Sequence, residues 1–387
     1  MASCHNPVGW YSTREGGSHH GECTPHRILA YLNAFLKRLG KSQRIHFLVY
    51  LVGLIWFIKF RSIREIARIF GQGRIDSLHQ FLTGSARKLE PLQEELRRTA
   101  FSQITESDPL LTIDDTACPR NGKAIEGIGI HHSGNGLVKG LCAVTAILKS
   151  ESQRWAWAIR GHRPKKTCPA KTFKSKIRLA IEILMDAVPL FAGRMLTVLM
   201  DSWYSCAKIL NFIHGLGWRY VAAIRKNRVV LSGGRKINVS HLAKGLKRFK
   251  CVRLSKHKRF RIASLIVRLP KIGNVRLFVS KQANSFRFYI SNDLDMTELE
   301  MARLYSQRFW IETFHQEIKQ HLGFREVFMR SWTGVQTHWT LVAIAYNLIG
   351  VASGNRSRSF RQKIRAFRDS FDPHALIHLP KKSGALR

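Results

Sequence analysis

Residues 305–319 read YSQRFWIETFHQEIK, a run without glycine or proline in which apolar residues recur at helical spacing. An α-helix turns by about 100° per residue, so this pattern predicts one helix. With Tyr305 at zero, Arg308 falls at about 300° and Glu312 at about 340° around that helix. Lys319 falls at about 320°. A tyrosine, an arginine, a carboxylate and a lysine therefore share one narrow stripe.

The other side of this predicted helix is suited to packing on a core. Its apolar side chains lie between about 140° and 260°. They are Leu304, Trp310, Ile311, Phe314 and Ile318. Glu317, at about 120°, points away from the stripe. The stripe itself allows two interpretations. It is a solvated face with i,i+4 ion pairs such as Arg308–Glu312, or a site where the carboxylate holds a divalent ion and the cations hold phosphate oxygens.

The charge of the chain favours a polyanionic partner. Among 387 residues there are 64 Lys and Arg against 25 Asp and Glu, a net charge of +39, and the sequence pI is about 10.8. Such an excess is typical of proteins that bind nucleic acid. A membrane surface is the weaker interpretation, because the basic residues spread through segments that look folded rather than forming one amphipathic tail.

Length and cysteine content set further bounds. With 45% hydrophobic residues the chain can form a large core, and its length suggests two or three domains. The longest apolar run, Phe47–Ile58, is about half of a bilayer span, and no signal peptide is recognisable. The 7 scattered cysteines, without a Cys-x-x-Cys, predict free thiols in a reducing compartment. We therefore expect a cytoplasmic, nucleoid-associated protein.

The first 105 residues divide into two parts. Residues 1–26 are rich in Gly, Ser and His and are expected to be disordered. Their possible zinc ligands do not have the spacing of a common zinc module. These are Cys4, His5, His19, His20, Cys23 and His26. Residues 27–105 are expected to form a helical DNA-binding domain, with two helices up to residue 60 and another at 88–102.

A helix-turn-helix pattern lies within that helical domain. Ser62 followed by Glu65 is a capping-box signature, and a glycine turn at 71–73 separates a helix at 62–70 from one at 74–82. A plain helical hairpin has the same pattern, but the basic charge favours DNA binding. The arginines that we expect to contact DNA are Arg64, Arg68 and Arg74.

Residues 106–228 change to an α/β pattern. Strands are predicted at 110–113, 125–131, 138–149, 195–200 and 218–224, and helices at 171–187 and 207–214. The first strand ends at Asp114-Asp115-Thr116, and the strand at 195–200 ends at Asp201. Residues 229–291 form a β-rich basic insertion, residues 292–352 return to the α/β domain with the helix that carries Glu312, and residues 353–387 form a basic tail.

Three acids stand out in a chain that has few. Asp115 and Asp201 follow apolar strands, and Glu312 lies on a helix that must pack beside them. Each aspartate alone also fits a helix or turn cap. Converging carboxylates repel one another unless metal ions neutralise them. Hard carboxylate oxygens suit Mg²⁺ or Mn²⁺, and two such ions about 3.5–4 Å apart can cleave a phosphodiester.

These motifs resemble the DDE transposases of bacterial insertion sequences, in the branch marked by Tyr-x2-Arg-x3-Glu-x6-Lys. Tyr305, Arg308, Glu312 and Lys319 match all four positions at the required gaps. Asp114-Asp115-Thr116 is similar to the first-aspartate motif of the family, and Asp201 to the second. A β-rich insertion before the glutamate is also a feature of this branch. The resemblance covers about residues 60–350.

The resemblance implies an RNase H-like catalytic domain that binds terminal inverted repeats, cleaves the DNA and joins the ends to target DNA. Asp115, Asp201 and Glu312 would hold two Mg²⁺ ions, with Mn²⁺ as a substitute. Tyr305, Arg308 and Lys319 would grip phosphates of double-stranded DNA. The family also implies a homodimer on paired ends. Asp114 and Asp115 must point to opposite faces of a strand. We favour Asp115, because Thr116 follows it as in the family pattern.

One feature departs from the family, and two functions compete with transposition. Members that pass through a DNA hairpin stack a flipped base on a tryptophan of the insertion, whereas residues 229–296 contain none. The rings that can stack a base here are Phe249, Phe260, Phe286, Phe288 and Tyr289. The competing functions are a DNA-binding protein that has lost catalysis and an RNase H-like nuclease without strand transfer.

Overall fold

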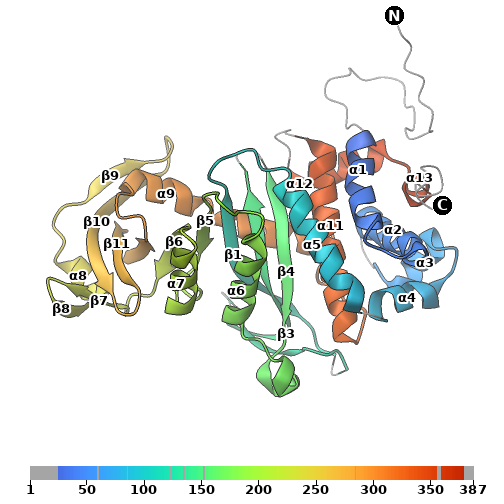
Figure 1. Cartoon of the computed structure of the whole chain (residues 1–387), viewed down its shortest axis with the longest axis horizontal. Coiled ribbons are helices and arrows are strands. Elements are labelled where there is room, and N and C mark those ends of the chain that lie inside the picture. Colours follow the sequence, from blue (N-terminus) through green and yellow to red (C-terminus); the bar gives the residue numbers. More distant parts are fainter. Residues whose placement is uncertain are drawn as a thin grey trace, which may run out of the picture.

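The computed structural model describes residues 25–378 except for 59–60, 85, 123, 134–135, 151–152, 284 and 355–358. The expected disorder of the N-terminus and five of its six possible zinc ligands, all but His26, lie outside the described residues. The described chain is a mixed α/β structure. Figure 1 shows the first and last helices at one end of the molecule and a yellow β-rich segment at the other.

Helices form the N-terminal part, as the sequence predicts. They are α1 (Pro25–Leu36), α2 (Lys41–Trp56), α3 (Ile63–Phe70), α4 (Ile75–Thr83) and α5 (Leu89–Phe101). Four of them, α1, α2, α4 and α5, pack against the long apolar helix α11 (Trp332–Ser353). Ser62 Oγ accepts the Glu65 backbone N–H at 3.2 Å, but the Glu65 carboxylate bonds to Arg68 instead of closing the capping box.

One sheet runs through the molecule. Its strand order is β2-β3-β1-β5-β6-β12-β11-β10-β7-β8, with β4 beside β3 and β9 beside β10. The first strands are β1 (Leu110–Pro119), β2 (Gly129–Ser133), β3 (Gly136–Lys149), β4 (Arg154–His162), β5 (Thr197–Met200) and β6 (Arg219–Ile224). β5 is parallel to both β1 and β6, whereas β3 is antiparallel to β1. No strand was predicted where β4 lies. The first strand was predicted to end at residue 113, whereas β1 continues through both aspartates.

The β-rich segment extends this sheet. It contains β7 (Val229–Ser232), β8 (Arg235–Asn238), β9 (Lys250–Arg253), β10 (Arg259–Leu269), β11 (Gly273–Lys281) and β12 (Phe286–Ser291), with the short helix α8 (Val239–Lys244). β12 pairs with β6, so the hydrogen-bonded ladder passes directly from the α/β strands into this segment. The continuous ladder fixes how the segment sits relative to the strands that carry the acids.

Helices cover the two faces of the sheet differently. α10 (Phe309–His321) packs against β1 and β3, and α6 (Lys176–Ala187) packs against β3 and β4. His315 on α10 bonds Thr145 Oγ1 at 2.7 Å, and Thr145 lies opposite Asp114 in the β1–β3 ladder. Side chains alternate between the faces of a strand, so Asp114 shares the α10 face and Asp115 the α6 face. α7 (Ala207–Gly215) packs beside α6 and β6.

The prediction of one helix over 305–319 is wrong. α9 (Glu298–Ser306) ends before α10 begins, and Gln307 and Arg308 form a turn between them. The backbone N–H groups of Gln307 and Arg308 bond to carbonyls three residues back, which tightens the chain into 3₁₀-type turns. Ser306 Oγ also bonds the Arg303 carbonyl at 2.7 Å. No glycine or proline announces this break.

The C-terminal segment is more ordered than the expected basic tail. Residues 360–377 form α12 (Phe360–Ser370) and α13 (Pro373–Ile377), both packed against α2. Phe360, Ile364 and Phe367 are buried at helical spacing. The many basic residues around this short stripe concealed it in the sequence. Across the described residues, no helix is both long and apolar enough to span a bilayer.

A buried arginine joins the N-terminal helices to the end of α10. Arg61 is 1% exposed, and its guanidinium contacts the Glu326 carboxylate at 2.7 Å and the carbonyls of Leu54 and His321. We expect Arg61→Ala to lower the free energy of unfolding by about 3 kcal/mol, because it removes one partner of a buried pair and leaves a cavity. Urea denaturation measures this loss. The exposed neighbour Arg64→Ala should change stability by less than about 0.5 kcal/mol, and equal effects would contradict the assignment.

Candidate active site

Two aspartates lie at the same level of neighbouring parallel strands, one within β1 and the other directly after β5. Ile113 on β1 lies opposite Met200, the last residue of β5. The next residue in each case is an acid, Asp114 or Asp201, so the two lie side by side at the point where β5 ends. The Asp201 carboxylate accepts the backbone N–H groups of Trp203 at 2.9 Å and Tyr204 at 3.3 Å. These bonds fix Asp201 at the tip of its strand.

Arg308 connects this pair to the glutamate. One guanidinium nitrogen lies 2.9 Å from the Asp114 carboxylate, and the other bonds to Glu312, one helical turn further along the chain. The Arg308 side chain is only 18% exposed. A largely buried cation therefore holds two carboxylates from distant parts of the sequence at one place.

The ionised form of the carboxylates is disfavoured at this site, because they are buried and lie close to one another. Burial, followed by the negative charge of Asp201, raises the pKa of Asp114 to about 7, although Arg308 opposes the shift. Burial also raises the pKa of Asp201, and the two backbone N–H donors and Arg308 counter it. Carboxylates that repel one another at a buried position favour a bound cation. The donor set consists of hard oxygens and so fits Mg²⁺ or Mn²⁺.

Asp115 lies on the other face of β1. Its carboxylate contacts Lys176 Nζ at 2.6 Å and the Tyr204 hydroxyl at 3.0 Å. The structure thus brings Asp114, not Asp115, to Arg308 and Glu312, and the catalytic role of either aspartate stays a prediction. Alternation could not decide between them in the sequence, because both faces of β1 are buried and apolar residues precede both acids.

The other two residues of the predicted stripe are Tyr305 and Lys319. The Arg308 guanidinium lies over the Tyr305 ring, 5.9 Å from its centre. Lys319 is half-buried, and burial lowers its pKa, with the Cys118 thiol opposing the shift and Arg325 adding to it. Glu317 points away from the stripe, as predicted, and bonds to Arg154 and to the Tyr346 hydroxyl.

A pocket of about 330 Å³ opens beside Glu312. Residues of α9, the start of α10 and β10–β12 line it. Its basic residues are Lys258, Arg287 and Arg308. Four aromatic residues also line it: Phe260, Tyr289, Tyr305 and Phe309. Of the rings predicted to stack a base, Phe260 and Tyr289 lie here. Phe249, Phe286 and Phe288 pack on one another instead. Lys258 and Arg287 were not among the residues predicted to contact DNA.

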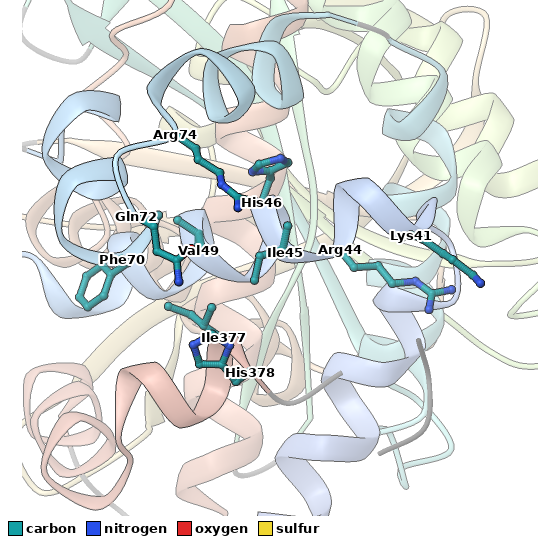
Figure 2. Close-up of a pocket in the computed structure, with 11 residues that line it drawn as sticks. Lys41, Arg44, Ile45, His46, Val49, Phe70, Gln72, Arg74, Ile377 and His378 are labelled. Atoms are coloured by element: carbon teal, nitrogen blue, oxygen red, sulfur yellow. The ribbon is translucent and has the colours of Figure 1, made fainter. Parts of the chain in front are cut away.

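The predicted helix-turn-helix arginines are exposed. Arg64 and Arg68 lie on α3, and Arg74 lies in the turn before α4. Figure 2 shows Arg74 at a second pocket, of about 270 Å³, where α2, the α3–α4 turn and the end of the described chain meet. Lys41, Arg44 and His46 line it as well, and none of the described residues that line it is acidic. This surface suits an anion.

Comparisons with known proteins show the family to which the chain belongs. The chain matches the family model described as DDE superfamily endonuclease over residues 34–259, more than half of its length. It therefore belongs to the DDE superfamily of endonucleases. Residues 174–348 also match the model of the transposase DDE domain. A related protein is a probable transposase for insertion sequence element IS701 of Microchaete diplosiphon, 27% identical over 290 residues that cover 71% of this chain and 74% of the relative. The resemblance to DDE insertion-sequence transposases is confirmed.

The pKa of Asp114 predicts a pH-dependent stability. Because its folded-state pKa of about 7 exceeds the ordinary 3.8, its stabilising contribution is complete below about pH 4 and is lost as the pH rises through about 7. Asp114→Asn resembles the protonated form, so the variant should gain stability relative to the parent between about pH 5 and 8. Urea unfolding with a chelator present measures this gain. The exposed Asp369→Asn should show none, and a gain that does not change with pH would contradict the assignment.

Proposed function

We propose that this protein is a transposase that binds the terminal inverted repeats of its element, cleaves the DNA and joins the ends to target DNA. The observation that carries the proposal is the meeting of Asp114, Asp201 and Glu312 around Arg308. These carboxylates would hold two divalent ions, Mg²⁺ or Mn²⁺. When bound, such ions activate the attacking oxygen and stabilise the leaving oxygen of a phosphodiester.

The sheet supports an RNase H-like reading of the catalytic domain. Antiparallel β4, β3 and β1 are followed by β5 and β6 parallel to β1, and acids lie at the centre of this arrangement. We propose the domain limits 106–228 and 292–352 for this unit, with residues 229–291 as an insertion and residues 27–105 as the helical DNA-binding domain. The helix that carries Glu312 then completes the site from the far side of the insertion.

The chain's own residues supply the grip on DNA. Arg308 neutralises Asp114 and Glu312 and lies beside the basic and aromatic pocket. A phosphate entering between Arg308 and the divalent ions would take over part of that pairing. Phe260, Tyr289 and Phe309 offer stacking surfaces for a base. Tyr305 lines the same pocket, and Lys319 lies in the last turn of α10. The net charge of +39 supports the same partner.

The full reaction also requires two ends to meet. We propose that a homodimer brings both transposon ends together, and this step rests on the family alone. A nuclease without strand transfer would cut the ends and never join them. A protein that has lost catalysis would bind them and never cut. An assay with labelled end DNA and a supercoiled target plasmid separates these three outcomes.

Substitution of the acids tests the active site. We expect Asp114→Asn, Asp201→Asn and Glu312→Gln each to lower the rate of Mg²⁺-dependent end cleavage by about a thousandfold or more, equivalent to about 4 kcal/mol of transition-state stabilisation. End binding should persist, because the lost groups are not phosphate contacts. Cleavage is measured per bound complex on a fixed end duplex.

The matched control is Asp115→Asn, one residue along the same strand. Its carboxylate pairs with Lys176 on the α6 face, so cleavage should fall far less than in the Asp114 variant. The reverse order, with Asp115 essential and Asp114 dispensable, would move the metal site to the other face of β1. Loss of binding with unchanged cleavage per complex would reject the proposed roles altogether.

Salt dependence tests the helix-turn-helix surface. Each phosphate contact adds about one to the slope of log affinity against log salt concentration. We expect Arg64→Ala, Arg68→Ala and Arg74→Ala each to reduce that slope by about 1 on an end duplex, measured by fluorescence anisotropy. Arg98→Ala is the control, because Arg98 is exposed and ion-paired as Arg68 is but lies on α5, outside the α3–turn–α4 unit. Equal slopes in all four variants would remove this surface from the interface.

A further inference from the structure

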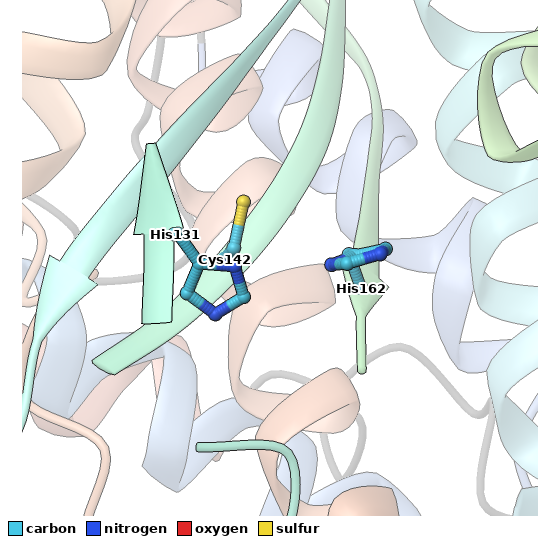
Figure 3. A group of neighbouring side chains, drawn as sticks. All are labelled: His131, Cys142 and His162. Atoms are coloured by element: carbon cyan, nitrogen blue, oxygen red, sulfur yellow. The ribbon is translucent and has the colours of Figure 1, made fainter. Parts of the chain in front are cut away.

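A second cluster of metal-ligating side chains lies on the α6 face of the sheet. His131 on β2, Cys142 on β3 and His162 on β4 each offer one ligand atom, and these atoms all lie within 4.8 Å of one another (Figure 3). His131 and Cys142 are buried, and His162 is half-buried. None of the three belongs to the proposed active site, and none was predicted from the sequence to bind a metal ion.

The strand pairing brings these residues together. Cys142 lies directly opposite His162 across β3 and β4, and opposite Ala117 across β3 and β1. Asp115 is two residues before Ala117 and therefore points to the same face. Its carboxylate accepts a hydrogen bond from the Cys142 thiol at 3.7 Å. Three strands thus direct two imidazoles and a thiol to one place, and the Asp115 carboxylate on the neighbouring β1 lies beside the thiol but outside this group of three.

The imidazoles are prepared to act as ligands. His131 Nε2 lies 3.1 Å from the carbonyl oxygen of Gly140, and with the hydrogen on Nε2 this bond leaves Nδ1 with a free lone pair. Metal-binding histidines are commonly oriented by such a bond from the other ring nitrogen. His162 Nδ1 is buried and has no hydrogen-bond partner among the described residues. A buried nitrogen without a partner is costly, and a metal ion would satisfy it.

Asp115, which contacts the Cys142 thiol, can become the fourth ligand if its carboxylate moves toward the two imidazoles. Its two oxygens accept bonds from Lys176 Nζ and from the Tyr204 hydroxyl. A carboxylate has about four lone-pair positions, so these two bonds leave room for a metal ion. Lys176 also hydrogen-bonds the Cys142 sulfur, so a bound divalent ion would displace its ammonium group from the thiolate. The negative charges of Asp115 and the Cys142 thiolate would then balance the ion.

From this geometry we infer a zinc site made of His131, Cys142, His162 and Asp115. Two imidazoles, a thiolate and a carboxylate are ligands that zinc accepts in tetrahedral geometry, whereas Mg²⁺ avoids sulfur. Tetrahedral zinc places its ligand atoms about 3.5 Å apart, so the His131, Cys142 and His162 atoms need only a small contraction, whereas the Asp115 carboxylate must move further. The ion would tie β1–β4 together on the face opposite the proposed active site and would play no part in cleavage.

Metal analysis of the full chain tests the site. We expect about one zinc per chain after purification without chelators, and excess Mg²⁺ should not displace it. Cys142→Ser and His162→Gln should each lower the zinc content at least tenfold. The matched control is Cys118→Ser, because Cys118 is also fully buried on a neighbouring strand but points to the opposite face. That variant should keep its zinc.

Cobalt provides a second measurement that does not depend on activity. Co²⁺ added to the metal-free chain should give a thiolate-to-cobalt charge-transfer band in the parent and in Cys118→Ser, and no such band in Cys142→Ser. His162→Gln, at a half-buried position, guards against misfolding of the cysteine variant. Absence of zinc from the parent, or zinc retained in both ligand variants, would overturn the inference. Zinc lost only when Cys4 and Cys23 are replaced would place it at the N-terminus instead.

Discussion

The contact on which the rest of the site depends is the ion pair between Arg308 and the Asp114 carboxylate. It joins the first strand of the sheet to a turn almost two hundred residues later in the chain. The same guanidinium also holds Glu312. The β-rich segment, which lies in the chain between Asp114 and Arg308, must therefore return α9 and α10 to one defined position. The ladder from β6 to β12 provides that constraint, since it leaves the returning chain little freedom.

Alternation along β1 gives the two faces of one strand different chemistry. Asp114 meets an arginine and two further acids, a set of hard oxygen donors. Asp115, its neighbour, meets a lysine, a phenol and a thiol beside two histidines. Adjacent acids with the same side chain thereby have different partners, because a strand cannot turn both toward the same partner. A slip of one residue in the register of β1 would exchange them.

Much of this arrangement follows from the sequence, and the parts that do not have physical reasons. Apolar runs predicted the strands that carry the acids, and the Tyr-Arg-Glu-Lys spacing selected Arg308 and Glu312. The choice between Asp114 and Asp115 depended on which helix covers which face, which is a tertiary property. β4 and its His162 were missed, and the 3₁₀ turn at Arg308 has no local signal. Local sequence patterns therefore could not decide which of two adjacent residues belongs to the site.

The turn at Arg308 changes the arrangement of the residues in the stripe. In one continuous helix Tyr305, Arg308 and Glu312 would form a rigid row. Here the row is broken, and the 3₁₀ bonds between α9 and α10 are weaker than a helical ladder. Under the proposed function, Arg308 would exchange its carboxylate partners for phosphate oxygens by adjusting a turn rather than by unwinding a helix. The same cation would then pair with the carboxylates before DNA binds and contact the phosphate backbone afterwards.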